Sequence, residues 1–259
     1  EMGKQPGFQQ VLYGAEVIKL KESVMVPLKS KLDRYIGGDY DISRFEALWD
    51  LGYLPIHVRA LEEGTICPIK VPMLTIHNDP SLPEFFWVPN YLETILSQLL
   101  WKPMTSATIA LGYKKIISKW AIKTTGEANI DFHAHDFSMR GLDAEYATMS
   151  SGIGHAACFS GSDSLPVLEA AEIYYNETGF VVGGVPATEH SVMCAGGKED
   201  ELKTFKRLLR IHPTGLLSVV SDTWDLWKVC TEILPTLKEN IMSRDGKLVI
   251  RPDSGNPVD

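Results

Sequence analysis

Polar and charged side chains follow several short apolar runs of this sequence, at the points where strands would end. Residues 181–192 read VVGGVPATEHSV, so two valines and two glycines lead to His190. Glycines permit tight turns, and histidine changes its charge nearest to neutral pH. Two later stretches have the same design: LLSVVSDTWD places Asp222, and KLVIRPDSGNP places Arg251 and Asp253, just past an apolar run. This repetition favours a shared site over isolated surface residues.

Functional groups of barrels and open α/β sheets gather at the C-terminal ends of the strands. By this rule seven residues converge on one mouth: Asp136, Arg140, Asp163, His190, Asp222, Arg251 and Asp253. Arginine donates paired hydrogen bonds to a phosphate, and carboxylates suit a ribose diol, Mg²⁺ or an amide NH₂. The set predicts a site for a phosphorylated sugar and a polar heterocycle. For each residue singly, a helix cap or a surface ion pair is the alternative.

Other motifs give weaker signals. Five further histidines are expected to be structural or surface residues: His57, His133, His135, His155 and His212. The HxH at 133 and 135 has no further Cys or His at metal-site spacing. Neither GxGxxG nor GxxxxGK[ST] occurs, which disfavours Rossmann and P-loop chemistry. Thr188 is expected to cap the helix that begins at Glu189, and Asp222 the helix that follows it.

The first part of the chain has mixed patterns. Residues 1–40 are hard to place, and 11–20 fit either a helix or a strand. The expected strands are 54–60, 66–71 and 73–77, which form a small antiparallel region. The expected helices are 40–50, then 87–100, which Pro103 ends, and then 105–121. We expect these elements to form a mixed α+β domain of residues 1–125.

Residues 126–259 instead alternate strand, turn and helix, which predicts parallel strands with helical crossovers. The expected strands are 130–135, 181–185, 216–220 and 248–250. The expected helices are 143–158, 165–175, 199–210 and 226–233.

Composition narrows the class of protein. The net charge of −8 argues against a general nucleic-acid binder. No apolar run approaches the roughly 18 residues of a membrane span, and no signal peptide begins the sequence. The four cysteines lack disulfide-like spacing, which indicates reduced thiols in a cytoplasmic protein. The first residue is not Met and the last ten stop just after a motif, so we expect a chain truncated at both ends.

Five stretches resemble one enzyme family in order and separation: HDFSMRG, FSGSDS, GGVPATEHS, LLSVVSDTWD and IRPDSGNP. Upstream, LPIHVRALEEGTICP and WVPNYLETILSQLLWKP resemble it too. From about residue 40 onward the chain looks like a nicotinamide or nicotinate phosphoribosyltransferase, a type II phosphoribosyltransferase. The resemblance implies an irregular (β/α) barrel joined to a second, mixed α/β domain rich in antiparallel strands. It also implies a homodimer with shared active sites.

The resemblance implies a reaction as well. Phosphoribosyl passes from 5-phosphoribosyl 1-pyrophosphate to nicotinamide, which gives nicotinamide mononucleotide and pyrophosphate in NAD biosynthesis. In this reaction ATP phosphorylates His190. The Mg²⁺ ion is bound by the pyrophosphate; no protein ligand of the metal is assigned, and Asp253 is the residue expected nearest to it. A nicotinate-using relative and a non-catalytic fragment are the alternatives.

Residue roles follow from the same resemblance. Phe137 resembles the aromatic that stacks on the pyridine ring, Arg140 flanks ring and phosphate, and Asp163 accepts the carboxamide NH₂. A carboxylate accepts a hydrogen bond from the amide of nicotinamide and repels the carboxylate of nicotinate. Two like charges side by side cost several kcal/mol, and about 1.4 kcal/mol corresponds to a tenfold change in affinity.

The remaining roles concern the nucleotide end of the site. His190 resembles the phosphorylated histidine, Asp222 its hydrogen-bonding partner and Glu189 its neighbour. Arg251 and Asp253 resemble the residues that hold phosphate and ribose, while Ser218 and Val249 line the same mouth. Gly184 stands where relatives can have serine. The family's N-terminal segment, which lends a tyrosine across the dimer, and its later glycine-rich phosphate loop have no counterpart here; without them this chain alone should be inactive.

Overall fold

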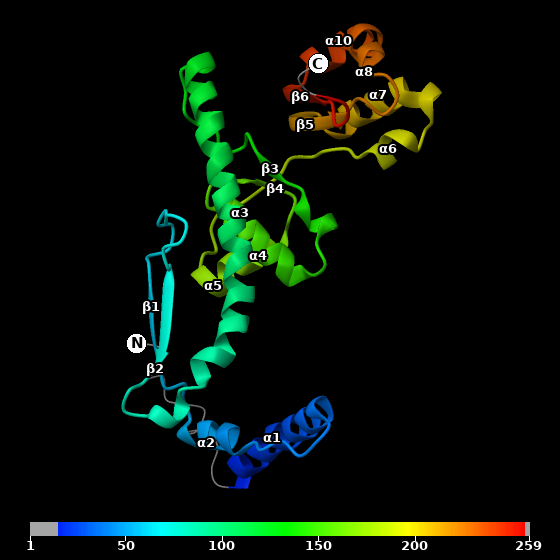
Figure 1. Ribbon diagram of the computed structural model, residues 1–259. Helices are drawn as coiled ribbons and strands as arrows, with labels where there is room; N and C mark the ends of the chain where they lie inside the picture. Colours follow the sequence, from blue (N-terminus) through cyan, green and yellow to red (C-terminus); the bar gives the residue numbers. More distant parts are fainter. Residues whose placement is uncertain (1–14, 257–259) are drawn as a thin grey trace. The chain divides into compact units, whose positions relative to one another are not determined.

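The computed structural model describes residues 15–256, with their side chains from residue 21 onward. The chain is a mixed α/β protein, as predicted, and divides into two compact units, 1–109 and 110–259. The division falls inside one long helix, α3 (Val88–Thr125) (Figure 1). The predicted domain boundary after residue 125 lies at the end of this helix instead, and it stays a prediction.

The first unit combines helices with one hairpin. Its elements are α1 (Ala15–Ile36), α2 (Ser43–Leu51), β1 (Ile56–Ala60), β2 (Leu74–Asn78) and the 3-10 turn η2 (Pro83–Phe85). The two strands pair antiparallel with His57 opposite His77, which confirms the predicted antiparallel region. Residues 66–71, however, form no strand, because Pro68 and the turn around it break the ladder. Of the ambiguous stretch 11–20, residues 11–14 lie outside the described residues, and the rest belong to α1.

Aromatic side chains hold the first unit together. Phe85, Trp87 and Val88 are buried at the start of α3, and Phe45 of α2 meets the Trp87 ring edge-on at 5.2 Å. Edge-to-face pairs add about 0.5–1.5 kcal/mol to the area that they bury. This cluster therefore fixes α2 against the beginning of α3.

The predicted break at Pro103 is wrong. Helix α3 continues through this residue to Thr125. A proline removes one N–H donor and kinks a helix, but apolar side chains on the far side can hold it in place. Ala110, Leu111 and Ile117 supply these contacts, since they belong to the cluster that contains buried Ile130 and Phe159.

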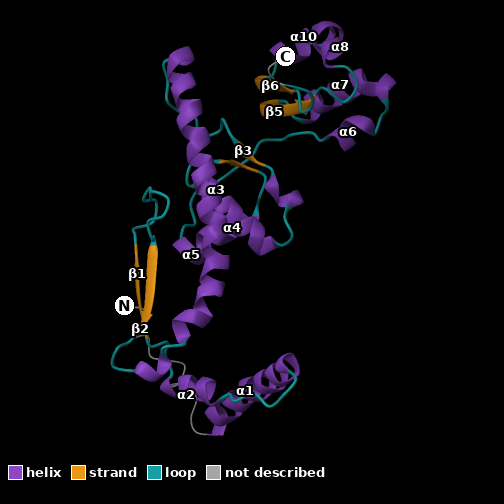
Figure 2. Ribbon diagram, in the orientation of Figure 1, coloured by secondary structure: helices purple, strands orange, loops and turns teal. Residues whose placement is uncertain are grey.

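The second unit carries the parallel strand pairs. Its strands are β3 (His135–Asp136), β4 (Gly161–Ser162), β5 (Thr214–Val220) and β6 (Asp245–Arg251) (Figure 2). Its longer helices are α4 (Glu145–Ala156), α5 (Pro166–Tyr175) and α7 (Glu201–Ile211), as the apolar periodicity predicted. The shorter ones are η3 (Ser138–Gly141), α6 (His190–Cys194), η4 (Lys198–Asp200), α8 (Leu226–Lys228), the π-helix η5 (Val229–Ile233), α9 (Leu234–Thr236) and α10 (Lys238–Met242).

Extended segments of the second unit lie side by side in chain order. β3 pairs with β4, and Gly161 of β4 bridges Gly183, both in parallel. Ala187 then bridges Ser218 of β5, and β5 pairs in parallel with β6. The expected strand 181–185 is thus reduced to one bridge, at Gly183. Glycines at 183 and 184 and a proline at 186, which lacks an N–H, interrupt a regular ladder.

A compact core supports β5 and β6. Phe205 and Leu209 of α7 pack with Val219 of β5 and Val229 of the following helix, and all four are buried. Burial of one such side chain stabilises a fold by about 1.5–3 kcal/mol. This core fixes where β5 ends, and therefore where the residues after it lie. In the described part of the chain, no helix has the length and apolar character that crossing a membrane requires.

Candidate active site

His190 stands between two carboxylates that come from different strand ends. Its Nε2 lies 3.4 Å from Asp222 Oδ1, and its Nδ1 lies 3.8 Å from Asp253 Oδ2. The three residues follow the bridge at Ala187, strand β5 and strand β6, as the sequence predicted for neighbouring parallel strands. The His190 side chain is 45% exposed, so solvent and small molecules can reach it.

Asp222 is the most enclosed member of this trio, with a side chain only 7% exposed. Its Oδ2 accepts hydrogen bonds from the Asp253 N–H (2.9 Å), the Ser254 N–H (2.6 Å) and the Ser254 hydroxyl (2.6 Å). Burial opposes ionisation, but these bonds outweigh it and lower the pKa of Asp222 from 3.8 to about 2. Asp222 is therefore an anion at neutral pH.

The other oxygen of Asp222 faces the imidazole. Oδ1 is buried and completes no hydrogen bond among the described residues. Its 3.4 Å separation from His190 Nε2 exceeds the roughly 2.7–2.9 Å of a charge-assisted hydrogen bond. The buried anion therefore faces the ring as an acceptor for an N–H or for a positive charge on the ring.

Two arginines connect the segment that carries His190 to the turn that carries Phe137. Arg140 Nη2 lies 3.0 Å from Glu189 Oε1. Arg251 donates from Nη2 to the Thr188 carbonyl (2.9 Å), and its guanidinium lies 5.9 Å from the centre of the Phe137 ring. These contacts bring the 137–140 turn beside the 188–190 turn.

Asp163 and Phe137 meet around a histidine. His135 Nε2 lies 2.8 Å from Asp163 Oδ1, and the His135 and Phe137 rings are 4.5 Å apart, tilted by 34°. Phe137 and Asp163 are both half exposed. The sequence assigned His135 a structural or surface role and missed this contact; its place at the end of a predicted strand, directly before Asp136 and Phe137, was the available signal.

Two further predicted residues lie within strands. Ser218 of β5 is buried and stands in register with Val249 of β6, which is partly exposed. The Ser218 N–H donates to the Pro186 carbonyl, and its own carbonyl accepts from the Thr188 N–H. Ser218 thereby holds the segment that leads to His190.

Neither of the two expected helix caps, Thr188 and Asp222, caps a helix in the structure. Thr188 accepts a hydrogen bond from the Val220 N–H at 3.0 Å instead of capping a helix, because its buried hydroxyl lies against β5. α6 begins at His190, with Glu189 as N-cap and no side-chain bond. Asp222 is occupied by the 253–254 turn, so Asp225 caps α8 through the Lys228 N–H.

Asp136 does not join the exposed mouth. It is buried, and its Oδ1 accepts from the Ser138 N–H at 2.9 Å, so it stabilises the turn that carries Phe137. Its role in the structure is that of a local cap, which was the alternative for this residue.

Carboxylates in the site suit a magnesium ion that arrives with a substrate. Among residues 15–256, no group of three or more His, Cys, Asp or Glu is placed to hold a metal. Mg²⁺ usually needs only one or two protein carboxylates beside substrate phosphates. The half-exposed Asp253 fits such a contact.

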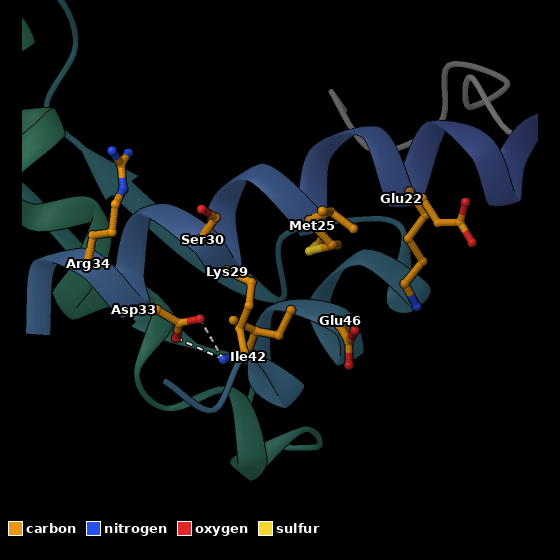
Figure 3. A pocket seen from close by; sticks show the side chains of 10 residues that line it. Glu22, Met25, Lys29, Ser30, Asp33, Arg34, Ile42 and Glu46 are labelled. Carbon is orange, nitrogen blue, oxygen red and sulfur yellow. Dashed lines mark hydrogen bonds and ion pairs between the residues drawn. The ribbon is translucent and has the colours of Figure 1, made fainter. Parts of the chain in front are cut away.

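The first unit contains a separate open pocket of about 760 Å³ along α1 and α2 (Figure 3). Lys29 in its wall contacts Asp33 at 2.8 Å and also contacts Asp39. Asp33 in turn accepts from the Tyr40 N–H at 2.7 Å. These charges tie the end of α1 to the chain that leads to α2. None of the predicted site residues lines this pocket.

Comparison with known proteins supplies the family. Residues 132–259 match the model of the nicotinate phosphoribosyltransferase (NAPRTase) family. The chain is 45% identical over 247 residues to the nicotinamide phosphoribosyltransferase of Acinetobacter baylyi, covering 92% of this chain and 48% of that protein. It is 38% identical to the Mycoplasma pneumoniae protein of the same name over 205 residues (78% and 43%). The Xanthomonas campestris pv. campestris protein of that name is 36% identical over 214 residues (80% and 45%). The chain therefore spans about half the length of these curated relatives.

Proposed function

Since the chain belongs to the nicotinate phosphoribosyltransferase (NAPRTase) family, we propose that the protein that contains it transfers phosphoribosyl from 5-phosphoribosyl 1-pyrophosphate to nicotinamide. The products are nicotinamide mononucleotide and pyrophosphate, a step of NAD biosynthesis. The observation that carries this choice is that the half-exposed Asp163 carboxylate and the half-exposed Phe137 ring both contact His135. Such a pair offers a flat amide-bearing heterocycle a stacking surface and an acceptor.

Asp163 favours nicotinamide over nicotinate. An ionised carboxylate only accepts hydrogen bonds, so it suits the NH₂ of a carboxamide. Nicotinate would place a second carboxylate against it, and like charges at close range cost several kcal/mol. The three relatives above are named for nicotinamide, which supports the same choice. Nicotinate stays the second candidate because the family carries its name.

The transfer reaction requires that nicotinamide be positioned, more than that it be chemically activated. The bond between C1 of the ribose and the pyrophosphate oxygen breaks, and the ring nitrogen of nicotinamide donates its lone pair to C1. No proton is transferred, and the product ring is a pyridinium. The transition state resembles an oxocarbenium ion, as in glycosyl transfer. Mg²⁺ would neutralise the leaving pyrophosphate. Stacking on Phe137 and contact with Asp163 would hold the ring in line.

The cationic residues fit the phosphates. Arg251 combines a bond to the Thr188 carbonyl with a position near Phe137, so its remaining N–H groups can reach a phosphate beside the ring. Arg140 is largely exposed and contacts Glu189 alone among the described residues, which leaves donors for substrate. In this proposal Asp253 serves the ribose diol or the magnesium ion.

His190 is the proposed acceptor of a phosphoryl group from ATP. In this proposal Nε2 carries the hydrogen that faces the nearer and more buried carboxylate, that of Asp222, and Nδ1 keeps its lone pair. Attack of Nδ1 on the γ-phosphorus forms the N–P bond, breaks the bond to ADP, and leaves the positive ring beside ionised Asp222. Hydrolysis of this phosphohistidine would couple ATP turnover to transfer.

The proposal extends to architecture and location. Parallel pairing in chain order, from β3 to β6, supports an irregular (β/α) barrel to which residues 126–259 contribute several strands. Residues 1–125 would form part of a second domain. We further propose a cytoplasmic homodimer with shared active sites, which would supply elements that lie outside this chain.

A product assay on the full-length protein tests the function. Nicotinamide and nicotinate compete at equal concentration with phosphoribosyl pyrophosphate, Mg²⁺ and ATP. The proposal predicts nicotinamide mononucleotide as the main product. Nicotinate mononucleotide as the main product would transfer the assignment to the second candidate, and no mononucleotide at all would indicate a non-catalytic role.

A further inference from the structure

His135 and Asp163 form a hydrogen-bonded pair across two neighbouring parallel strands. His135 begins β3, and Asp163 directly follows β4. The separation of 2.8 Å between His135 Nε2 and Asp163 Oδ1 is that of a strong hydrogen bond. Because an ionised carboxylate only accepts, the hydrogen lies on Nε2.

Glycines leave the space that this pair occupies. A Cβ at Gly161 would lie 2.9 Å from His135 Nδ1 and 2.7 Å from the Ala134 carbonyl oxygen. A Cβ at Gly184 would lie 3.2 Å from Asp163 Oδ1. Side chains at these two positions would press on the imidazole or on the carboxylate. The imidazole also lies 4.5 Å from the Phe137 ring.

The pair leaves one carboxylate oxygen open. Among the described residues, hydrogen bonds to the Asp163 side chain come from His135 alone, and they reach Oδ1. The Asp163 side chain is 53% exposed, whereas that of His135 is 25% exposed. A carboxylate held at one oxygen loses rotational freedom before the substrate binds, and such preorganisation strengthens the contact made by the other oxygen.

We propose that His135 is a positioning residue for the pyridine amide: it fixes Asp163 through Oδ1, so that Oδ2 accepts the carboxamide NH₂. This inference rests on the proposed function and deepens it. His135 acts through Asp163, and it does not take part in bond making at C1. It therefore affects affinity for the amide substrate and leaves the pyrophosphate substrate unaffected.

The test compares three variants of the full-length protein. His135→Leu removes the donor, and His135→Gln keeps an N–H at the end of the side chain. His133→Leu is the matched control, because His133 belongs to the same HxH and is exposed. We expect His135→Leu to raise the KM for nicotinamide about tenfold, the loss of one hydrogen bond. The KM for phosphoribosyl pyrophosphate and the kcat/KM for nicotinate stay unchanged. His135→Gln stays within about threefold of the wild type, and the control within twofold.

Equal losses for nicotinamide, nicotinate and phosphoribosyl pyrophosphate, or no loss for any, would overturn the inference. ¹⁵N spectra of the wild-type histidine rings provide a measurement that requires neither a folded His135→Leu variant nor activity. They should show the Nε2–H form of His135 and a change of its signal in Asp163→Asn. An Nδ1–H form of His135, or a His135 signal that does not change in Asp163→Asn, would contradict the pairing. A wild-type protein that makes no mononucleotide refutes the proposed function instead, and the spectra still decide the pair.

Discussion

Ser254 donates both its backbone N–H and its hydroxyl to one oxygen of Asp222, each at 2.6 Å, across 32 positions of the sequence. This double contact fixes the turn after β6 to the end of β5. It also keeps Asp222 charged beside His190. The histidine thus faces an anion whose charge and position are set by the turn after the neighbouring parallel strand β6.

The first prediction concerns stability at low pH. The folded pKa of Asp222, about 2, lies below its ordinary value of 3.8. A depressed pKa contributes stability that is fully present above the unfolded value and is lost as the pH falls through the folded one. Relative to Asp222→Asn, the wild type should therefore lose on the order of 1–2 kcal/mol of unfolding free energy between about pH 4 and pH 2. Urea unfolding of both proteins across this range measures it; a constant difference would show that Asp222 is not held as an anion.

A second prediction concerns His190. His190→Ala removes the proposed phosphoryl acceptor but leaves Phe137 and Asp163 in place. We expect ATP hydrolysis to disappear, while slow transfer without ATP persists. Parallel measurement of ADP release and of mononucleotide formation separates the two activities. Loss of both to the same degree would indicate a structural role for His190.

The third prediction concerns packing between α4 and α5. A Cβ at Gly152 of α4 would lie 2.1 Å from Val167 Cγ2, a distance that two carbons cannot share. Gly152→Ala should therefore destabilise the protein by about 1–3 kcal/mol through overpacking. The control is Gly112→Ala in α3, where no atom beyond the neighbouring helix backbone lies within 4 Å of the added Cβ. It should stabilise by about 0.5–1 kcal/mol, since alanine favours a helix over glycine. Thermal unfolding that moves the two variants in the same direction would contradict this packing.

The sequence predicted much of this site because each residue follows an apolar run. His190, Asp222 and Asp253 meet as expected for neighbouring parallel strands, since chain order and spatial order agree there. Other features depend on contacts that no local pattern records. Thr188 satisfies the Val220 N–H rather than a helix end, and a single sequence does not reveal which distant amide lacks a partner. His135 was missed for the same reason.

The secondary-structure elements were also predicted in part. Long amphipathic helices such as α7 were predicted because their apolar spacing repeats over several turns. The strand expected over 181–185 is reduced to one bridge, at Gly183, because its glycines and Pro186 weaken a ladder that apolar content alone suggested. The break expected at Pro103 failed because packing along α3 outweighs one lost hydrogen bond.

Replacement of the Asp163 carboxylate by an amide tests the central claim, that this carboxylate selects nicotinamide over nicotinate. Asp163→Asn removes the negative charge and keeps the size of the side chain. In the full-length protein, the ratio of kcat/KM for nicotinate to that for nicotinamide should rise at least about tenfold, since the like-charge repulsion disappears. A ratio that does not change, with both mononucleotides quantified in the same reaction, would contradict the account.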